Sequence, residues 1–209
     1  MIVILLFLLK IKTLINKYIF KKDISFWDNY DVPEKNAIDF AHEHINLEPK
    51  RCFHTDDDPY TNHYTIEYLL AFFGISINQE IRHNDPYSKA NIIANIVNSN
   101  NTDTPFIVYR GIAWSTLLEM YKRAKEFPDA DLYEIGFVHT SLVRDHELIN
   151  SCHLRIFVPS GSSCVYLGNV NYEQHYYEVV LQRGAKFKFL SIDNKYINLE
   201  YIPEHIYYS

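Results

Sequence analysis

The sequence predicts an α+β domain, because a helical first half is followed by a strand-rich second half. Apolar side chains recur at helical intervals over the first hundred residues, whereas short β-branched and aromatic runs separated by turn residues follow Ile135. The 209 residues, 47% hydrophobic and 22% charged, are enough for one globular domain with a buried core. Helices and strands do not alternate, and neither GxGxxG nor GxxxxGK[ST] occurs, so the common nucleotide-binding folds have no signature.

Four helices are expected. Ile38, Ala41 and Ile45 are spaced for the first helix, Gly74 is a natural stop for the second, and Ser88 and Ser115 are candidate N-caps of the last two. The predicted segments are VPEKNAIDFAHEHI (32–45), HYTIEYLLAFFGI (63–75), SKANIIANIVNSNN (88–101) and STLLEMYKRAKEF (115–127). Residues 47–62 are expected to form a loop before the second helix.

Seven strands are expected, one before the last helix and six after it. Each is rich in β-branched or aromatic residues and is bounded by turn residues such as Pro159, Gly161 and Gly184. The predicted strands are PFIVYRGI (105–112), GFVHTSL (136–142), HLRIFV (153–158), SCVYLG (163–168), YYEVVLQ (176–182), AKFKFLSI (185–192) and INLEYI (197–202).

Residues 1–22 differ from the rest of the chain. They carry five lysines and no acid, so the remaining residues are more acidic than the net charge of −6. Their apolar run is too short for a bilayer core of roughly 30 Å, and a signal peptide, a membrane-surface anchor, a first helix or a mis-assigned start all remain open. We expect residues 1–22 to be a separate hydrophobic and basic segment and residues 23–209 to be a single domain.

Metal chemistry is not indicated. The three cysteines form no CxxC pair, HExxH is absent, and Asp56, Asp57 and Asp58 lack the spacing of a calcium loop. The cysteines are therefore expected to be buried or inert thiols. The acidic balance also argues against a general nucleic-acid binder, although an enzyme acting on nucleic acid needs only one local basic site.

Three polar features interrupt the apolar strands. Arg110 ends the first strand, His139, Thr140 and Ser141 lie together in the second, and Glu178 precedes a buried run. Taken singly, each has a plain structural reading: an arginine paired with a carboxylate, a satisfied polar face and a surface charge. Arg110 is followed by Gly111, whose lack of a side chain permits close approach to the backbone, and a guanidinium suits bidentate phosphate binding.

Together, these features form a recognisable order. A YRG strand is followed some thirty residues later by a GF..TSL strand, then by VPSG and by Glu178-V-V-L-Q-R-G-A-K-F. This order resembles the mono-ADP-ribosyltransferases of the R-S-E type, which include binary actin-modifying toxins, clostridial Rho-modifying exoenzymes and vertebrate ectoenzymes. The resemblance covers roughly residues 30–192. It implies a helical N-terminal half packed on the split, mostly antiparallel β-sheet core of the ADP-ribosyltransferase type.

The resemblance also implies a reaction: transfer of ADP-ribose from NAD to an acceptor, with release of nicotinamide and without a metal. Arg110, flanked by Tyr109 and Gly111, would grip a phosphate of NAD, and Thr140 and Ser141 would line the nicotinamide pocket. Glu178 would hydrogen-bond the nicotinamide ribose. A fixed anion there would stabilise the oxocarbenium-like transition state more than the ground state.

Three departures from the family pattern bear on mechanism. His139 stands where members carry the serine that contacts the glutamate, and it could either donate a hydrogen bond in its place or block the pocket. Tyr176 stands two residues before Glu178, where members carry Glu or Gln, so arginine as the acceptor is in doubt. The early helix offers Glu67 and Ala71 in place of Asn and Arg, so that either Arg144 or Arg155 supplies a second phosphate contact or the affinity for NAD is low.

The expected partners are NAD and, as acceptor, a protein. An NAD glycohydrolase and a catalytically inactive binding module on the same fold are the alternatives. The resemblance further implies a toxin or effector that is secreted or delivered into a host cell, with membrane association through residues 1–22 or a cytoplasmic location as the other readings.

Overall fold

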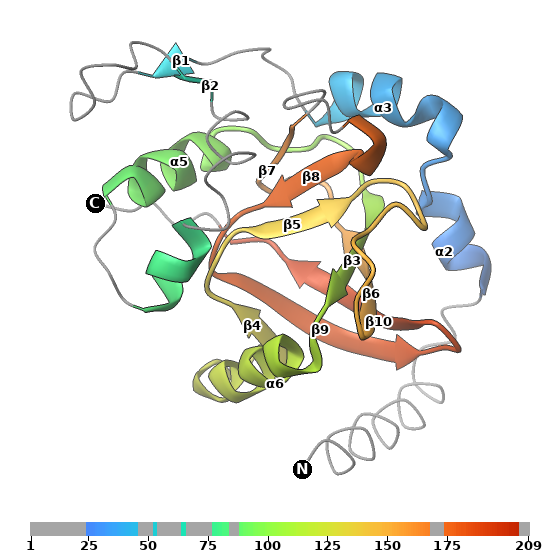
Figure 1. Ribbon diagram of the computed structural model, residues 1–209. Coiled ribbons are helices and arrows are strands. Elements are labelled where there is room, and N and C mark those ends of the chain that lie inside the picture. Colours follow the sequence, from blue (N-terminus) through green and yellow to red (C-terminus); the bar gives the residue numbers. More distant parts are fainter. Residues whose placement is uncertain are drawn as a thin grey trace.

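The computed structural model describes residues 24–45, 52–53, 64–65, 77–83, 88–167 and 174–204. Within these residues most helices precede a large sheet of mainly antiparallel strands, which confirms the predicted α+β class (Figure 1). The helices are α2 (Ile24–Tyr30), α3 (Ala37–His44), α5 (Ser88–Asn98) and α6 (Trp114–Arg123), with short 3-10 turns at η1 (Glu34–Asn36), η2 (Ala124–Glu126) and η4 (Gln174–Tyr176). Residues 77–82 are also helical.

Eight strands join in one sheet in the order β4-β9-β10-β6-β3-β5-β8-β7. They are β3 (Phe106–Ile112), β4 (Leu132–Glu134), β5 (Val138–Ser141), β6 (Cys152–Val158), β7 (Cys164–Tyr166), β8 (Glu178–Leu181), β9 (Ala185–Ile192) and β10 (Tyr196–Ile202). All neighbours pair antiparallel except β10 and β6, which are parallel. All strands predicted for the second half are therefore present.

The sheet is split between β3 and β5. These two strands share the single register pair Tyr109 and Ser141, whereas β3 and β6 are paired along their whole length. One part of the sheet therefore carries β4, β9, β10, β6 and β3, and the other carries β5, β8 and β7. This geometry matches the split sheet expected from the family resemblance.

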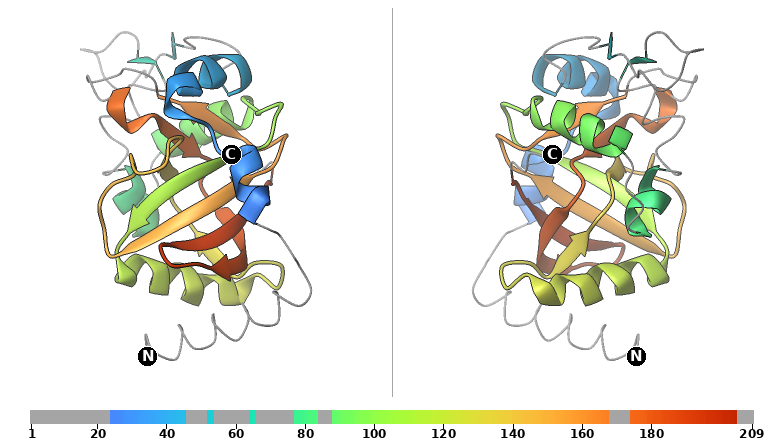
Figure 2. Two further views of the ribbon diagram at one scale, coloured as in Figure 1. Left: turned by 90° about the vertical axis from the view of Figure 1, so that its right-hand side faces the viewer. Right: turned by 90° about the vertical axis from the view of Figure 1, so that its left-hand side faces the viewer.

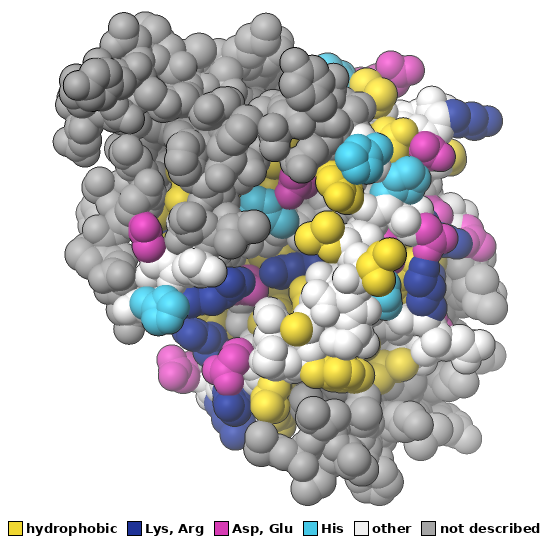
Figure 3. All heavy atoms as spheres, in the orientation of Figure 1, with side chains coloured by type: hydrophobic (Ala, Val, Ile, Leu, Met, Phe, Trp, Pro, Cys, Tyr) yellow, Lys and Arg dark blue, Asp and Glu magenta, His cyan; other side chains and the backbone are white. Residues whose placement is uncertain are grey.

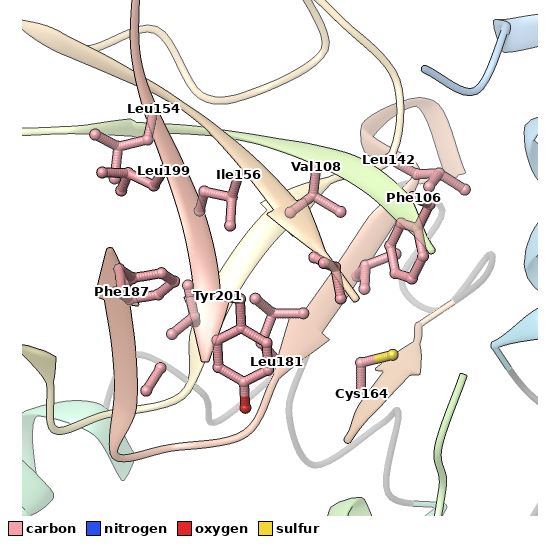
Figure 4. Close-up of a cluster of buried hydrophobic side chains, with 14 of the residues drawn as sticks. Phe106, Val108, Leu142, Leu154, Ile156, Cys164, Leu181, Phe187, Leu199 and Tyr201 are labelled. Atoms are coloured by element: carbon pink, nitrogen blue, oxygen red, sulfur yellow. The ribbon is translucent and has the colours of Figure 1, made fainter. Parts of the chain in front are cut away.

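The main hydrophobic core lies between the two parts of the sheet. Figure 4 shows buried side chains from both parts, such as Val108 and Ile156 from one and Leu181 from the other, pointing toward one another. Side chains of α3 and α6, including Ala41 and Leu117, are buried in the same cluster. Figure 2 shows α3 above the strands and α6 below them, so these helices close the two ends of the core.

Two smaller clusters cover the outer faces of the sheet. In the first, residues 77–81 and α5 pack on Phe137 and Val180. In the second, Trp27 of α2 packs on Tyr109 and Tyr196. Residues 77–81 and α5 thus lie against the part of the sheet that carries His139 and Glu178. Helix α2 lies against the part that carries Arg110.

Several local predictions need correction. Cys52–Phe53 and Tyr64–Thr65 form a short antiparallel pair, β1 and β2, so the predicted loop contains a strand and the second helix does not begin at His63. Aromatic and β-branched residues such as Tyr64 and Thr65 favour strands. The remainder of that predicted helix, residues 66–75, and the predicted segment 1–22 lie outside the described residues.

Neither predicted serine cap holds. Helix α5 already includes Ser88, and α6 begins at Trp114 after Ala113, which makes no side-chain cap. The first free amide of α6, that of Trp114, instead donates to Ser151 Oγ at 3.2 Å. A side chain distant in sequence thus satisfies one of the unpaired N–H groups that every helix start exposes. Local sequence could not predict this contact.

Candidate active site

Strands β5 and β8 bring two of the predicted site residues into direct contact. Their antiparallel register places His139 opposite Val180 and Ser141 opposite Glu178, so all four side chains share one face. His139 Nδ1 lies 2.7 Å from Glu178 Oε1. The side chains are 26% and 23% exposed, respectively, so the pair is accessible at the surface.

The backbone before Glu178 fixes where its carboxylate points. Tyr177 adopts φ 45°, a left-handed conformation that is uncommon for a residue other than glycine. Its carbonyl accepts a hydrogen bond from the Leu142 amide at 2.9 Å, and the Glu178 carbonyl accepts one from the Leu167 amide at 2.9 Å. The turn from η4 into β8 is therefore tied to both neighbouring strands at the position of the glutamate.

The hydroxyl groups of Thr140 and Ser141, next to His139, form hydrogen bonds with backbone groups. Thr140 Oγ1 donates to the Val179 carbonyl at 2.6 Å. Ser141 Oγ donates to the Val143 carbonyl at 2.8 Å and accepts from the Val143 amide at 3.1 Å. These contacts fix β5 against β8 and shape the turn after β5. The side chain that reaches the carboxylate is thus His139, at the position where family members carry serine.

Arg110 belongs to a second, more buried group of charges. Its Nη2 lies 3.4 Å from Glu134 Oε2, and Arg82 Nη2 lies 3.1 Å from the same oxygen. The Gly136 amide donates to Glu134 Oε1 at 3.1 Å. The side chains of Arg110 and Glu134 are 11% and 3% exposed. Arg110 Nη1 is buried and has no hydrogen-bond partner among the described residues.

Burial and pairing act in opposite directions on this group. Burial lowers the pKa of Arg110, and the charge of Glu134 opposes that effect. Burial alone would raise the pKa of Glu134, but the two arginines and the Gly136 amide outweigh it, so this pKa lies below its ordinary value. Glu134 and Arg82 were not singled out in the sequence, because their meeting depends on long-range packing.

Gly111 is required by a neighbouring loop. A Cβ atom at Gly111 would lie 1.7 Å from the Leu148 carbonyl oxygen, far inside van der Waals contact. The loop between β5 and β6 therefore packs directly on the backbone of β3. The close approach predicted at this glycine exists, but the group that approaches is another part of the chain.

Tyr109 and Arg144 lie together in a separate cluster. The Tyr109 hydroxyl donates to Asp31 Oδ1 at 2.6 Å and accepts from Arg144 Nε at 3.3 Å, while Arg144 also pairs with Asp31 Oδ2 at 2.8 Å. Burial and the hydrogen bond to Asp31 raise the pKa of Tyr109, which is fully buried. Arg155, the other candidate for a phosphate contact, pairs with Asp193 at 2.6 Å.

Tyr176 lies in η4, just before the glutamate. Its half-buried ring packs against the exposed ring of His175, with 4.1 Å between the centroids and an angle of 40° between the ring planes. The His175 carbonyl lies 2.6 Å from His146 Nδ1, which ties this turn to the loop after β5. Tyr176 therefore lies at the rim of the site.

No group of three His, Cys, Asp or Glu side chains in the described part of the chain could hold a metal ion. Cys152 and Cys164 are buried free thiols, as predicted, and burial raises their pKa values to about 11 and about 12. Among the described helices, none is long and apolar enough to cross a membrane. On the face of Figure 1, histidine and acidic side chains lie close together above a group of basic side chains near the middle of the molecule (Figure 3).

The split, mostly antiparallel sheet, with Arg110 on β3, Thr140 and Ser141 on β5 and Glu178 at the start of β8, has the arrangement that the family resemblance implies. The model of the family described as "ADP-ribosyltransferase exoenzyme" matches residues 67–202, more than half of the chain. The chain belongs to this family. It is therefore an NAD-dependent ADP-ribosyltransferase, which confirms the enzyme class expected from the sequence.

Solved structures confirm the fold. C3stau2 from S. aureus, solved with NAD, is 18% identical with a TM-score of 0.52 and covers 66% of this chain and 85% of its own. Plx2a, an ADP-ribosyltransferase toxin from Paenibacillus larvae, is 19% identical with a TM-score of 0.57 and covers 80% and 94%. The enzymatic component C2-I of the C2-toxin from Clostridium botulinum is 17% identical with a TM-score of 0.51 and covers 66% and 42%. No curated protein matches the sequence.

Proposed function

We propose that this enzyme transfers ADP-ribose from NAD to a protein acceptor, that Glu178 stabilises the developing charge on the ribose, and that Arg110 binds a phosphate. The observation that carries the proposal is the contact between His139 and Glu178 at 2.7 Å, at the strand position that the family motif assigns to the catalytic glutamate. Oε1 accepts the histidine contact, so the second carboxylate oxygen can accept a hydrogen bond from a ribose hydroxyl.

Breaking the bond between ribose and nicotinamide develops positive charge on the sugar. A carboxylate fixed on two paired strands stabilises that charge without having to reorganise during the reaction. The histidine contact keeps the carboxylate oriented. Glu178 is 23% exposed, so the ribose can approach it from solvent.

Arg110 is suited to hold NAD because its guanidinium is only partly used. Nη2 contacts Glu134, while Nη1 is buried without a partner among the described residues. An unpaired buried donor costs about 1–3 kcal/mol, and a phosphate oxygen would relieve that cost. Arg144 and Arg155 support a phosphate role less well, because each already pairs with an aspartate.

The remaining assignments rest on position. Thr140 and Ser141 would line the nicotinamide side of the site, Gly111 and Tyr109 would hold the strand that carries Arg110, and Tyr176 at the rim would contact the acceptor. Residues 23–209 would act as one catalytic domain. The fold shared with toxins supports release from the producing cell and delivery into a target cell, and residues 1–22 would serve that export or a membrane contact.

Nicotinamide release from NAD by the purified protein tests this proposal. Glu178→Gln should lower the rate roughly 100-fold or more while the protein stays folded, since the amide has the same shape but no charge. Glu119→Gln, at an exposed position on α6, is the matched control and should leave the rate unchanged. Equal rates for the wild type and Glu178→Gln would remove the catalytic assignment.

Incubation with a cell lysate and labelled NAD tests the acceptor. Label in protein that depends on Glu178 would support transfer to protein. Free ADP-ribose as the sole product would favour a glycohydrolase instead.

A further inference from the structure

His139 has one ring nitrogen on Glu178 and the other without a partner. Nδ1 contacts the carboxylate at 2.7 Å, and Nε2 is buried with no hydrogen-bond partner among the described residues. We propose that His139 is a general base that takes a proton through Nε2 from the acceptor, and that the acceptor is a hydroxyl group. This inference rests on the transferase function proposed above.

The contact with Glu178 sets the tautomer of the neutral imidazole. A carboxylate oxygen only accepts hydrogen bonds, so the ring hydrogen must be on Nδ1. The lone pair is then on Nε2. A carboxylate that holds an imidazole in this way keeps the base correctly oriented and stabilises the imidazolium that forms when the proton is taken.

The protein does not use the lone pair on Nε2. A buried acceptor without a partner costs about 1–3 kcal/mol, so a ligand that donates a hydrogen bond there would be favoured. The ring as a whole is 26% exposed, so the imidazole lies at the edge of the site and is not part of the apolar core. The hydroxyl of an acceptor supplies the donor that the protein lacks.

A base is needed because the residue two places before Glu178 is a phenol. A phenol is a weaker base than a carboxylate or an imidazole, and the Tyr176 ring packs against His175. Glu134, the buried carboxylate of the Arg110 cluster, is already bound by Arg110 and Arg82. His139 is therefore the group in contact with Glu178 that has a free lone pair with which to accept a proton.

The step balances without a further reactant. The acceptor oxygen forms a bond to the ribose carbon as the bond from that carbon to nicotinamide breaks, and the electron pair of the broken bond goes to the nicotinamide nitrogen. The hydroxyl proton passes to His139 Nε2. Glu178 stays ionised throughout, with Oε1 toward the imidazolium and Oε2 toward the ribose.

The same chemistry selects the class of acceptor. A guanidinium is a cation without a free lone pair and stays protonated in proteins, so imidazole cannot activate it. It would also bring positive charge next to the oxocarbenium ion. A neutral hydroxyl, as in serine, threonine or tyrosine, gains nucleophilicity when its proton is removed.

Two small nucleophiles test the role of His139. The first nucleophile is methanol, which must lose a proton as it reacts. The second is azide ion, which has no proton to lose. With each of them, both nicotinamide release and the product of transfer (methyl-ADP-ribose or the azide adduct) are measured. In His139→Asn the amide can still donate to Glu178 but offers no base. We expect turnover with water and methanol to fall about 10²- to 10⁴-fold, and azide to restore turnover to within a few-fold of the wild type.

A second histidine provides the matched control. His153 Nδ1 lies 3.0 Å from Glu147 Oε1, and the two side chains are 25% and 1% exposed, so His153 forms a second histidine–carboxylate contact, with a carboxylate that is buried. His153→Asn should leave turnover with both nucleophiles unchanged. His139→Ser restores the residue that family members carry, and serine is also unable to act as a base. This variant should behave as His139→Asn, so that a folding defect in one of the two variants does not decide the test.

The outcomes are separable. Equal losses with methanol and azide would mean that His139 only positions Glu178, and unchanged methanolysis would mean that it has no role; either result overturns the inference and leaves the transferase function standing. Transfer to agmatine, a guanidinium compound, at a rate matching methanol would overturn the acceptor class. A wild-type protein that releases no nicotinamide with either nucleophile would overturn both the function and the inference.

Discussion

Two glutamates, each at the end of a strand of the large sheet, have opposite surroundings. Glu134 ends β4 and is 3% exposed, with two arginines and a backbone amide bound to its carboxylate. Glu178 begins β8, is 23% exposed and contacts one histidine. Both carboxylate oxygens of Glu134 are therefore bound by protein groups, whereas one carboxylate oxygen of Glu178 is left for a ligand. The comparison teaches that the more heavily bonded charge holds the structure, while the less satisfied one is suited to chemistry.

The largest effect expected from this comparison is on stability. Glu134→Gln removes the charge that neutralises the buried guanidinium of Arg110 and the partly exposed one of Arg82, and breaking a buried ion pair in this way costs about 3–5 kcal/mol. Glu178→Gln should cost less than about 1 kcal/mol, because that side chain is partly solvated. Urea unfolding of the two variants beside the wild type measures both values. Similar losses for the two variants would show that the distinction between the glutamates is wrong.

The stability gap between the wild type and Glu134→Gln should depend on pH. The pKa of Glu134 is lowered in the folded protein, so its contribution is fully present above the pKa of the unfolded chain and is lost as the pH falls through the folded pKa. The amide of Glu134→Gln does not titrate. The gap should therefore be widest near neutral pH and narrow in acid. Thermal melting from pH 7 down to pH 3 checks this, and a constant gap would contradict it.

Gly111 follows Arg110 of the buried charge cluster in β3, and the loop after β5 packs directly on it. A Cβ atom there would meet the Leu148 carbonyl at 1.7 Å, so Gly111→Ala must move either the loop or β3, at a cost of about 1–3 kcal/mol. Because Arg110 is the preceding residue, the KM for NAD should also rise. Gly161→Ala is the control: at φ 83° it is strained, but its Cβ meets no atom within 4 Å. Both variants should lose stability. A KM for NAD in Gly111→Ala equal to that of the wild type would mean that the packing of this loop on β3 does not affect NAD binding.

The sequence predicted the fold class well because its signals are local. The strands of the second half follow from β-branched and aromatic runs between turn residues, and α5 follows from its apolar spacing. Strand β4 and helix α2 were missed, because Leu132–Glu134 and Ile24–Tyr30 are short and owe their form to packing.

The assignment of the site residues stays a prediction. The motif order singled out Glu178, His139 and Arg110, and the structure brings His139 and Glu178 into contact. The motif order could not identify Glu134, Arg82 or the cap from Ser151, because each depends on a contact between segments far apart in sequence. It also could not show that Tyr109 and Arg144 are bound to Asp31.

The smallest effect is expected from Arg110→Lys, which tests whether the buried cluster also serves NAD. Lysine keeps the charge that Glu134 needs, but it lacks the fork that lets one nitrogen hold the carboxylate while another contacts a phosphate. The KM for NAD should rise about tenfold, equivalent to about 1.4 kcal/mol, with kcat changed less than about threefold. Arg82→Lys is the matched control, because Arg82 contacts the same Glu134 oxygen at 3.1 Å but its side chain is 36% exposed. An unchanged KM in Arg110→Lys would mean that Arg110, Arg82 and Glu134 serve only the stability of the fold. An equal rise of KM in both variants would mean that the effect comes from the disturbed contact with Glu134 and not from a lost phosphate contact.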